Sequence, residues 1–181
     1  RNAIRASAKK TIWLPQMISI EEAVTQWSGI IMADNIDLLF ELIDIDAQLH
    51  VEQDSDLSVF GGQAAQMAKD FDEIDQYGID AKKVFNYVLD NKKLEIWNFD
   101  EEKSKEKERK YLHFFQSLND YYIRLRERLS QQGKGYYGMI TRQLAEMPED
   151  LLLTRIGDGN IIFAGFNAIS RSEERFSRNA E

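Results

Sequence analysis

The chain has 181 residues, of which 31 are acidic and 23 basic, and its formal net charge is −8 at neutral pH. Hydrophobic residues make up 43% and cysteine is absent, so the composition fits a folded globular protein without disulfides or thiolate metal sites. Proteins that depend on DNA binding usually carry a basic excess, so this acidity argues against a dominant nucleic-acid-binding face. No apolar run reaches the roughly 18 residues of a membrane span, and we expect a cytoplasmic protein without a membrane partner.

The first part of the sequence predicts an interrupted strand followed by two helices. Residues 12–20 (IWLPQMISI) are apolar but contain a central proline, which favours an edge or interrupted strand over a helix. Ser19, followed by two glutamates, is typical of a helix start and predicts a short helix over residues 21–27. Asp34 is suited to capping the next helix, in which apolar side chains recur at helical spacing over residues 36–49. Because apolar residues occupy much of its circumference, we expect that helix to be buried.

The middle of the chain is predicted to be helical. A loop over residues 53–62 precedes a helix over 63–77, and Gly78 separates that helix from another over 80–89. A longer helix follows, with apolar residues at alternating steps of four and three: Tyr111, Phe115, Leu118, Tyr122, Leu125 and Leu129. We interpret this narrow apolar face as core. A further short helix is predicted over residues 138–147, where a proline stops it.

The segment over residues 157–169 (GDGNIIFAGFNAI) has the pattern of a buried strand that leads into a loop. A turn signal precedes the apolar residues 161–163, and two small residues follow, Ala164 and Gly165. In α/β proteins the loop at the carboxyl end of a buried parallel strand commonly carries the catalytic groups. Here no acidic side chain occupies that place. A capping-box pattern beginning at Ser170 then predicts a final helix.

One acidic cluster could be read as part of a metal-dependent nuclease signature: Asp70, Asp72, Glu73 and Asp75, followed by Asp80-Ala81-Lys82. That chemistry needs carboxylates and a lysine that converge from adjacent strands on a divalent cation. The region has helical periodicity instead, so we interpret the cluster as a solvated acidic face of a helix. No phosphate-binding loop motif occurs in the sequence, and we expect neither a metal nor a cofactor in this segment.

Histidine and arginine residues give weaker signals. His50 and His113 lie far apart in the sequence without a neighbouring serine or acid pattern. We expect them at the surface or at the edge of the core, without a catalytic role. Arg124, Arg126 and Arg128 alternate along the long helix, so their side chains spread around it and do not form one phosphate-binding stripe.

Five stretches of the sequence together resemble one protein family. They are IWLPQMISIEEAV, ADNIDLLFELIDI, DFDEIDQYGIDAKKVFNYVLDNKKLEIWNFDEE, GKGYYGMITRQLAEM and NIIFAGFNAISRSEERF. They look like the N-terminal region of AddB/RecC-like proteins of the Bacteroidetes lineage. Such proteins contain an inactivated superfamily I helicase domain and, in AddB-type members, a C-terminal PD-(D/E)XK nuclease. The resemblance covers most of the chain.

The resemblance implies a helix-rich α/β fold, namely a partial RecA-like parallel sheet of the P-loop NTPase type with a helical insertion. Residues 1–33 and 149–181 would form the RecA-like part, and residues 34–148 the insertion. In active superfamily I helicases the strand equivalent to residues 161–163 leads into an Asp-Glu-x-Gln-Asp motif. There the Asp binds Mg²⁺ and the Glu activates the hydrolytic water.

In this sequence the resemblance places Ala164 at the Asp and Gly165 at the Glu, followed by Phe166 and Asn167. Neither of the first two residues can ligate a cation or accept a proton, and phosphoryl transfer depends on such positioned charge. The resemblance therefore implies a degenerate magnesium and hydrolysis loop, with no catalytic residue and no cofactor in this segment.

The function implied by the resemblance is non-catalytic. The chain would be a DNA-guiding or subunit-docking scaffold of an AddAB/RecBCD-like helicase–nuclease in double-strand-break repair. Its partners would be DNA and an active helicase–nuclease subunit. DNA contact would be expected on the basic residues Lys82, Lys83, Arg124, Arg128 and Arg171.

Two alternatives stay open. Because both ends of the chain are charged and helix-like, we expect a piece of a longer protein, whose PD-(D/E)XK nuclease site could lie beyond residue 181. The parent would then be an exonuclease that needs no ATP or depends on a partner. The other alternative is a helical protein-interaction module unrelated to helicases. It predicts that the segment 161–165 has no parallel neighbour from residues 12–20.

Overall fold

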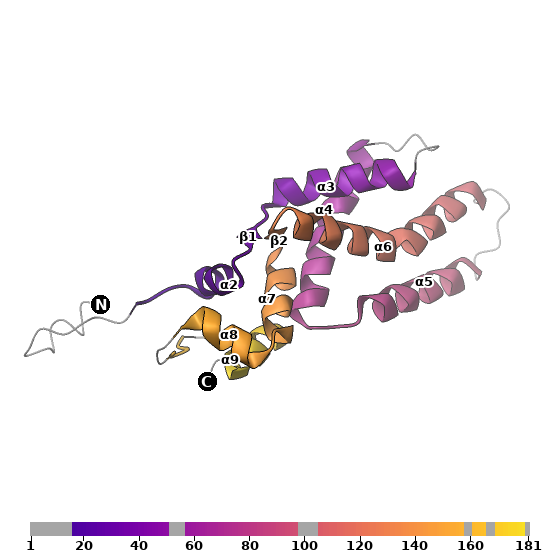
Figure 1. The fold of residues 1–181 in the computed structure, drawn as a ribbon. Helices are drawn as coiled ribbons and strands as arrows, with labels where there is room; N and C mark the ends of the chain where they lie inside the picture. Colours follow the sequence, from indigo (N-terminus) through magenta and orange to yellow (C-terminus); the bar gives the residue numbers. More distant parts are fainter. Residues whose placement is uncertain (1–15, 51–56, 98–104, 158–160, 166–168, 180–181) are drawn as a thin grey trace, which may run out of the picture.

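The computed structural model describes residues 16–50, 57–97, 105–157, 161–165 and 169–179. The elements in chain order are α2 (Ile20–Ser28), β1 (Ile31–Met32), α3 (Asn35–Leu49), α4 (Leu57–Gln76), α5 (Ala81–Trp97), α6 (Lys105–Gln131), β2 (Lys134–Gly135), α7 (Tyr137–Glu146), α8 (Glu149–Ile156) and α9 (Arg171–Asn179). Figure 1 shows α5 and α6 side by side at one end, and α2, α8 and α9 around α7 at the other. None of these helices combines the length and the apolar character needed to cross a bilayer.

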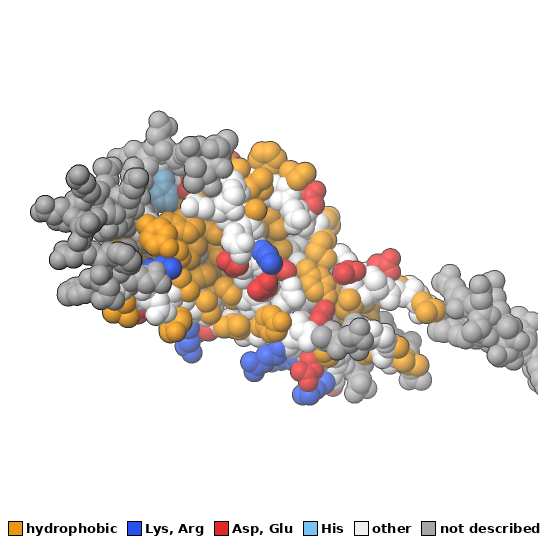
Figure 2. Space-filling model, turned by 180° about the vertical axis from the view of Figure 1, so that it is seen from behind, with side chains coloured by type: hydrophobic (Ala, Val, Ile, Leu, Met, Phe, Trp, Pro, Cys, Tyr) orange, Lys and Arg blue, Asp and Glu red, His pale blue; other side chains and the backbone are white. Residues whose placement is uncertain are grey.

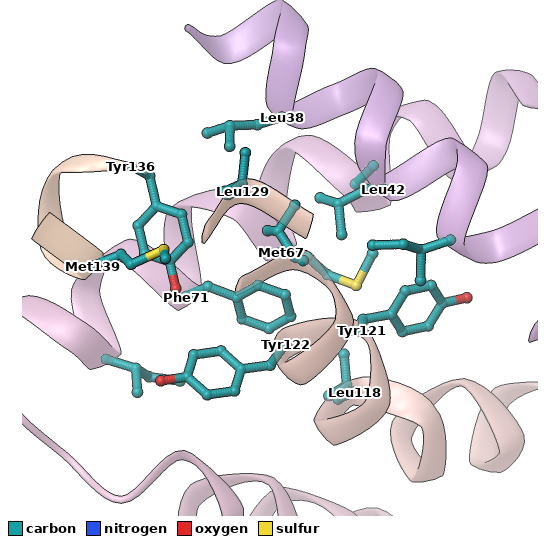
Figure 3. Packing of buried hydrophobic residues seen from close by; sticks show 14 of the residues in the cluster. Leu38, Leu42, Met67, Phe71, Leu118, Tyr121, Tyr122, Leu129, Tyr136 and Met139 are labelled. Carbon is teal, nitrogen blue, oxygen red and sulfur yellow. The ribbon is translucent and has the colours of Figure 1, made fainter. Parts of the chain in front are cut away.

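The larger hydrophobic cluster forms where α3, α4 and α6 meet, and Figure 3 shows its packing. Helix α6 contributes the buried side chains Leu118, Tyr121, Tyr122, Leu125 and Leu129. Leu42 of α3 and Phe71 of α4 pack into the same cluster and are almost completely buried. The long helix and its apolar face are thus confirmed. At its start, however, Tyr111 is 45% exposed, so the face extends beyond the core there.

A smaller hydrophobic cluster joins α2, α7 and α8. Trp27 of α2, Leu144 of α7 and Leu152 of α8 are buried in it, and Ile161 and Phe163 pack against it. Helix α7 takes part in both clusters, because Met139 belongs to the larger one and its neighbour Ile140 to the smaller one. This helix therefore links the two ends of the molecule.

The prediction of a RecA-like sheet is wrong. In the described residues the only sheet has two strands, β1 and β2, which pair in parallel with Ile31 opposite Lys134. Residues 161–165 are not a strand, and residues 16–19 precede α2 without strand structure; residues 12–15 lie outside the described part. The apolar run was misleading because Ile161 and Phe163 contact the smaller cluster without a strand beside them, whereas Ile162 is 86% exposed. The fold is helical instead of RecA-like α/β.

Several helix limits follow the capping chemistry that the sequence predicts. Ser19 and Glu22 form a capping box at α2, Asp34 caps α3 through the amide of Asp37, and Ser170 caps α9. Other predictions are wrong. Helix α4 begins at Leu57, within the segment expected to be a loop, and helix α5 continues to Trp97, beyond the expected end at residue 89. Helix α8 was not expected at all.

Candidate functional site

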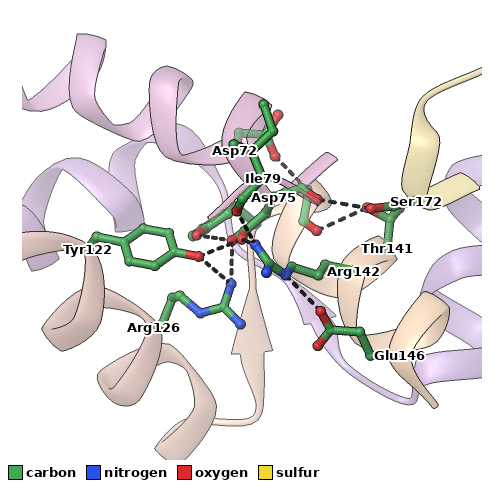
Figure 4. Close-up of polar contacts among 11 residues, drawn as sticks. Asp72, Asp75, Ile79, Tyr122, Arg126, Thr141, Arg142, Glu146 and Ser172 are labelled. Carbon is green, nitrogen blue, oxygen red and sulfur yellow. Dashed lines mark hydrogen bonds and ion pairs between the residues drawn. The ribbon is translucent and has the colours of Figure 1, made fainter. Parts of the chain in front are cut away.

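One polar cluster is centred on Asp75 of α4, whose side chain is completely buried. Its carboxylate accepts from four groups of α6, α7 and the residue before α7: Tyr122 Oη at 2.6 Å, Tyr136 Oη at 2.5 Å, Arg126 Nη1 at 2.5 Å and Arg142 Nη1 at 3.0 Å. Figure 4 shows Tyr122 and Arg126 of α6 and Arg142 of α7 converging on Asp75. We call these five residues the Asp75 cluster. A buried carboxylate with this many donors is a charge that the fold has neutralised.

The surroundings of the Asp75 cluster complete its hydrogen bonding. Ser172 of α9 donates to the backbone oxygen of Asp75, and Arg142 also donates to the backbone oxygen of Ile79. Burial, helped by the bond to Asp75, raises the pKa of Tyr122 to about 12. The same two influences raise the pKa of Tyr136 well above its ordinary value. These hydroxyls therefore stay protonated and act as donors, so the cluster is suited to hold helices together.

Asp72, one turn before Asp75, caps a neighbouring helix. Its Oδ1 accepts from the backbone amide of Gly138 at 2.5 Å, and α7 lacks a side-chain cap of its own. Helices α4 and α7 approach very closely here, since a Cβ at Gly138 would lie 2.1 Å from the backbone oxygen of Asp72. Burial raises the pKa of Asp72, although the Gly138 amide acts in the opposite direction. The expectation of a solvated acidic face is therefore wrong for Asp72 and Asp75, and it holds for the exposed Asp70 and Glu73.

A second polar cluster brings together both histidines of the chain, and we call it the histidine cluster. It consists of Asp46 and His50 of α3 and its C-cap, and of His113 and Tyr121 of α6. The Tyr121 hydroxyl donates to Asp46 Oδ1, which also lies 2.9 Å from His50 Nδ1. His50 Nε2 lies 3.2 Å from His113 Nδ1. His113 is exposed, whereas His50 is only 11% exposed in its side chain.

This cluster was not predicted from the sequence, because three of its contacts join residues that are 63 or more positions apart. A signal was nevertheless present. Asp46 follows Leu42 by four residues and Ile45 by one, which places it beside the buried face of α3. Helical spacing then places His50 one turn further along the same face.

The basic residues expected to contact DNA lie on three helices. Lys82 and Lys83 are exposed near the start of α5, Arg124 is exposed on α6, and Arg171 opens α9. Arg128 lies between α6 and α3, where its Nη1 is 3.0 Å from Glu41 Oε2. On the face drawn in Figure 2, Lys and Arg side chains are scattered among acidic and hydrophobic ones.

The residues expected to form the degenerate magnesium loop are only partly described. Ala164 and Gly165 are exposed and follow no strand, and Gly165 has a φ of 84°. Phe166 and Asn167 lie outside the described residues. The expected strand end is therefore missing from the described structure, and with it the geometric basis for placing a former hydrolysis loop here.

Helix α3 has apolar residues on two faces. Leu38, Leu42 and Ile45 face the larger cluster and are buried. Ile36 and Phe40, one turn apart, are each 63% exposed. The sequence-based expectation that this helix is buried is correct for the first face only. Two large apolar side chains one turn apart form an exposed stripe, which we call the outer face of α3.

No group of three or more His, Asp or Glu side chains in the described part of the chain is arranged to hold a metal ion.

Comparisons with known proteins identify no relative of this chain. No protein-family model, curated protein or solved structure matches the chain, so the family resemblance stays a prediction and the residues themselves must support any function.

Proposed function

We propose that this chain is a non-catalytic docking scaffold of an AddB-like helicase–nuclease, acting in the cytoplasm in double-strand-break repair. The observation that carries the proposal is the outer face of α3. A helix that packs on the core needs only one apolar face, and α3 has a second one directed at solvent. Contiguous exposed apolar side chains commonly mark a protein–protein contact.

The geometry of α3 suits it to such a contact. Ile36 and Phe40 are spaced by one helical turn, so both side chains can enter one groove of a partner. Their helix is held rigidly from behind by Leu38, Leu42 and Ile45. A rigid aromatic anchor loses little conformational entropy on binding, which favours affinity.

The acidic residues that could suggest catalysis are engaged in structural contacts. Asp75 is enclosed by four donors and has no exposed surface, and Asp72 caps α7. A general base or a metal ligand must reach its substrate or its ion. These contacts support a non-catalytic role for the described helices.

Docking is better supported than DNA guiding. The chain is acidic overall, and Arg128 is already paired with Glu41. Phosphate contacts need cationic groups that are available to the backbone of DNA.

The test is a binding measurement with the active helicase–nuclease subunit of the same organism. We expect wild-type chain to bind, and Phe40→Ser to weaken the complex by roughly 30-fold or more, as removal of a buried aromatic anchor does. Tyr87→Ser is the matched control, because Tyr87 is an exposed aromatic residue on another helix and is 71% exposed. Equal affinity of the wild type and Phe40→Ser, or no complex at all, would contradict the proposal.

A second arm of the test uses fluorescently labelled single-stranded DNA. We expect no electrostatic binding to this DNA, that is, no complex whose affinity falls as the salt concentration rises. Salt-sensitive binding that Arg124→Ala reduces would instead support the DNA-guiding function.

A further inference from the structure

The rings of His50 and His113 contact each other through one nitrogen of each ring. The contact between His50 and Asp46 determines which nitrogen of His50 carries the proton. The carboxylate of Asp46 can only accept a hydrogen bond, so the nearby Nδ1 of His50 carries the proton. In the neutral ring, Nε2 of His50 then has a free lone pair, and this atom lies 3.2 Å from Nδ1 of His113. Without a ligand, Nδ1 of His113 is the donor in this contact.

The separation of the two rings matches the coordination of one tetrahedral metal ion. Two imidazole nitrogens bound to Zn²⁺ at 2.0–2.1 Å are about 3.3 Å apart, and their ring centroids about 5.2 Å apart. In this structure the nitrogens are 3.2 Å apart and the centroids 5.1 Å apart. The rings are inclined to one another by 66°. Little movement would therefore be needed to place both lone pairs on one ion.

Asp46 supplies the support that histidine ligands of zinc commonly have. A histidine that binds a metal through one nitrogen usually donates its other N–H to a carboxylate, which fixes the ring and increases its basicity. Asp46 has this relation to His50, and the Tyr121 hydroxyl donates to the same carboxylate oxygen. Asp46 is 7% exposed in its side chain, so it is suited to orient His50 and not to bind the ion itself.

We infer that His50 Nε2 and His113 Nδ1 form a two-histidine site for Zn²⁺, with Asp46 as the residue that positions His50. Water or a donor from a partner molecule completes the coordination, because the described residues supply no third His, Asp or Glu ligand. When zinc binds, the proton of His113 moves from Nδ1 to Nε2 through solvent, so the rings lose no proton overall. Nitrogen donors select zinc-like ions over Mg²⁺ and Ca²⁺, which prefer oxygen.

The composition makes this site easy to test. The chain has only two histidines and no cysteine, so a protein without a histidine tag has no competing imidazole or thiolate. Calorimetric titration with zinc chloride should show one ion per chain. His113→Gln should weaken binding at least tenfold, and Asp46→Asn by about tenfold, as loss of an outer partner does. Gln116→Ala, at an exposed position on the same helix, is the matched control and should bind like the wild type.

Long-range ¹H–¹⁵N spectra of the histidine rings give an independent measurement. With zinc, Nε2 of His50 and Nδ1 of His113 should be the metal-bound nitrogens, and Nδ1 of His50 should keep its proton. Circular dichroism must show that each variant is folded; His113 is exposed, so its variant keeps the test valid. Wild-type protein that binds no zinc at micromolar concentrations, or a His113→Gln variant that binds equally well, would overturn the inference. So would metal-bound nitrogens other than these two.

Discussion

The adjacent residues Tyr121 and Tyr122 of α6 hold two buried aspartates in different ways. Figure 3 shows the two rings leaving α6 in opposite directions. The Tyr121 hydroxyl donates to Asp46 of α3, and the Tyr122 hydroxyl donates to Asp75 of α4. Asp75 is in addition bound by two arginines, whereas the further partner of Asp46 is His50.

The difference lies in what the rest of each cluster can do. The donors around Asp75 are arginines and tyrosines that remain protonated at neutral pH, so this cluster has no group to offer a ligand. The partner of Asp46 is an imidazole with a second nitrogen that points toward another imidazole at the surface. The two Tyr–Asp pairs are chemically alike but have different roles. The Tyr122–Asp75 pair contributes to stability and, by our inference, the Tyr121–Asp46 pair supports zinc binding.

The largest expected effect is the loss of the Asp75 carboxylate. Asp75→Ala leaves Arg126 and Arg142 without their buried counter-charge and leaves buried hydroxyls without an acceptor. Breaking a buried ion pair on one side typically costs about 3–5 kcal/mol in the free energy of unfolding. Urea unfolding of the variant and the wild type measures this cost. Asp70→Ala, at an exposed position of α4, should change it by less than about 0.5 kcal/mol; equal effects of the two would contradict the structural role of Asp75.

Alkaline pH should destabilise the folded state through Tyr122, which belongs to the Asp75 cluster. The pKa of Tyr122 in the folded state is about 12, above its ordinary value of 10.0. Because the folded state holds this proton more tightly, its stabilising contribution is complete below pH 10 and is lost as the pH rises through about 12. The loss corresponds to about 3 kcal/mol at most.

The measurement compares unfolding free energies of the wild type and Tyr122→Phe between pH 8 and pH 12. Stability of the wild type should fall more steeply above pH 10 than that of the variant, which has no phenol at this position. Parallel curves for the two proteins would show that Tyr122 does not keep its proton in this way.

A smaller effect is expected where α4 and α7 cross. Gly138→Ala would place a methyl group against the backbone oxygen of Asp72, so the two helices must move apart. Such overpacking typically costs about 1–3 kcal/mol. Gly61→Ala is the control within α4, because no atom lies within 4 Å of its added Cβ; it should stabilise the helix by about 0.5–1 kcal/mol. A Gly138→Ala variant as stable as the wild type in thermal unfolding would contradict the close crossing.

The sequence predicted local features well where local chemistry decides them. The apolar spacing of α6 and the caps at Ser19, Asp34 and Ser170 needed no knowledge of distant residues. The prediction that the short helix ends before Pro148 is confirmed, since α7 ends at Glu146. Helix α8 was not predicted because Pro148 is also the N-cap residue of a new helix, which starts with two acidic residues.

Features that depend on distant partners could not be predicted. The apolar run at residues 161–163 is compatible with a strand, and whether another strand lies beside it is decided by the rest of the chain. Asp46 and Asp75 have the same local pattern, an aspartate after a buried isoleucine and four residues after Leu42 or Phe71. This pattern indicates burial of the aspartate, but the arginines or histidines that meet it come from other helices.

The most direct test of the contrast between the Asp75 cluster and the histidine cluster is the thermal unfolding midpoint with and without excess zinc. A ligand that binds only the folded state raises this midpoint. We predict that zinc raises it for the wild type and for Tyr122→Phe, whose change lies on the Asp75 side, and not for His113→Gln. A rise that His113→Gln retains in full, or no rise in the wild type, would contradict the account.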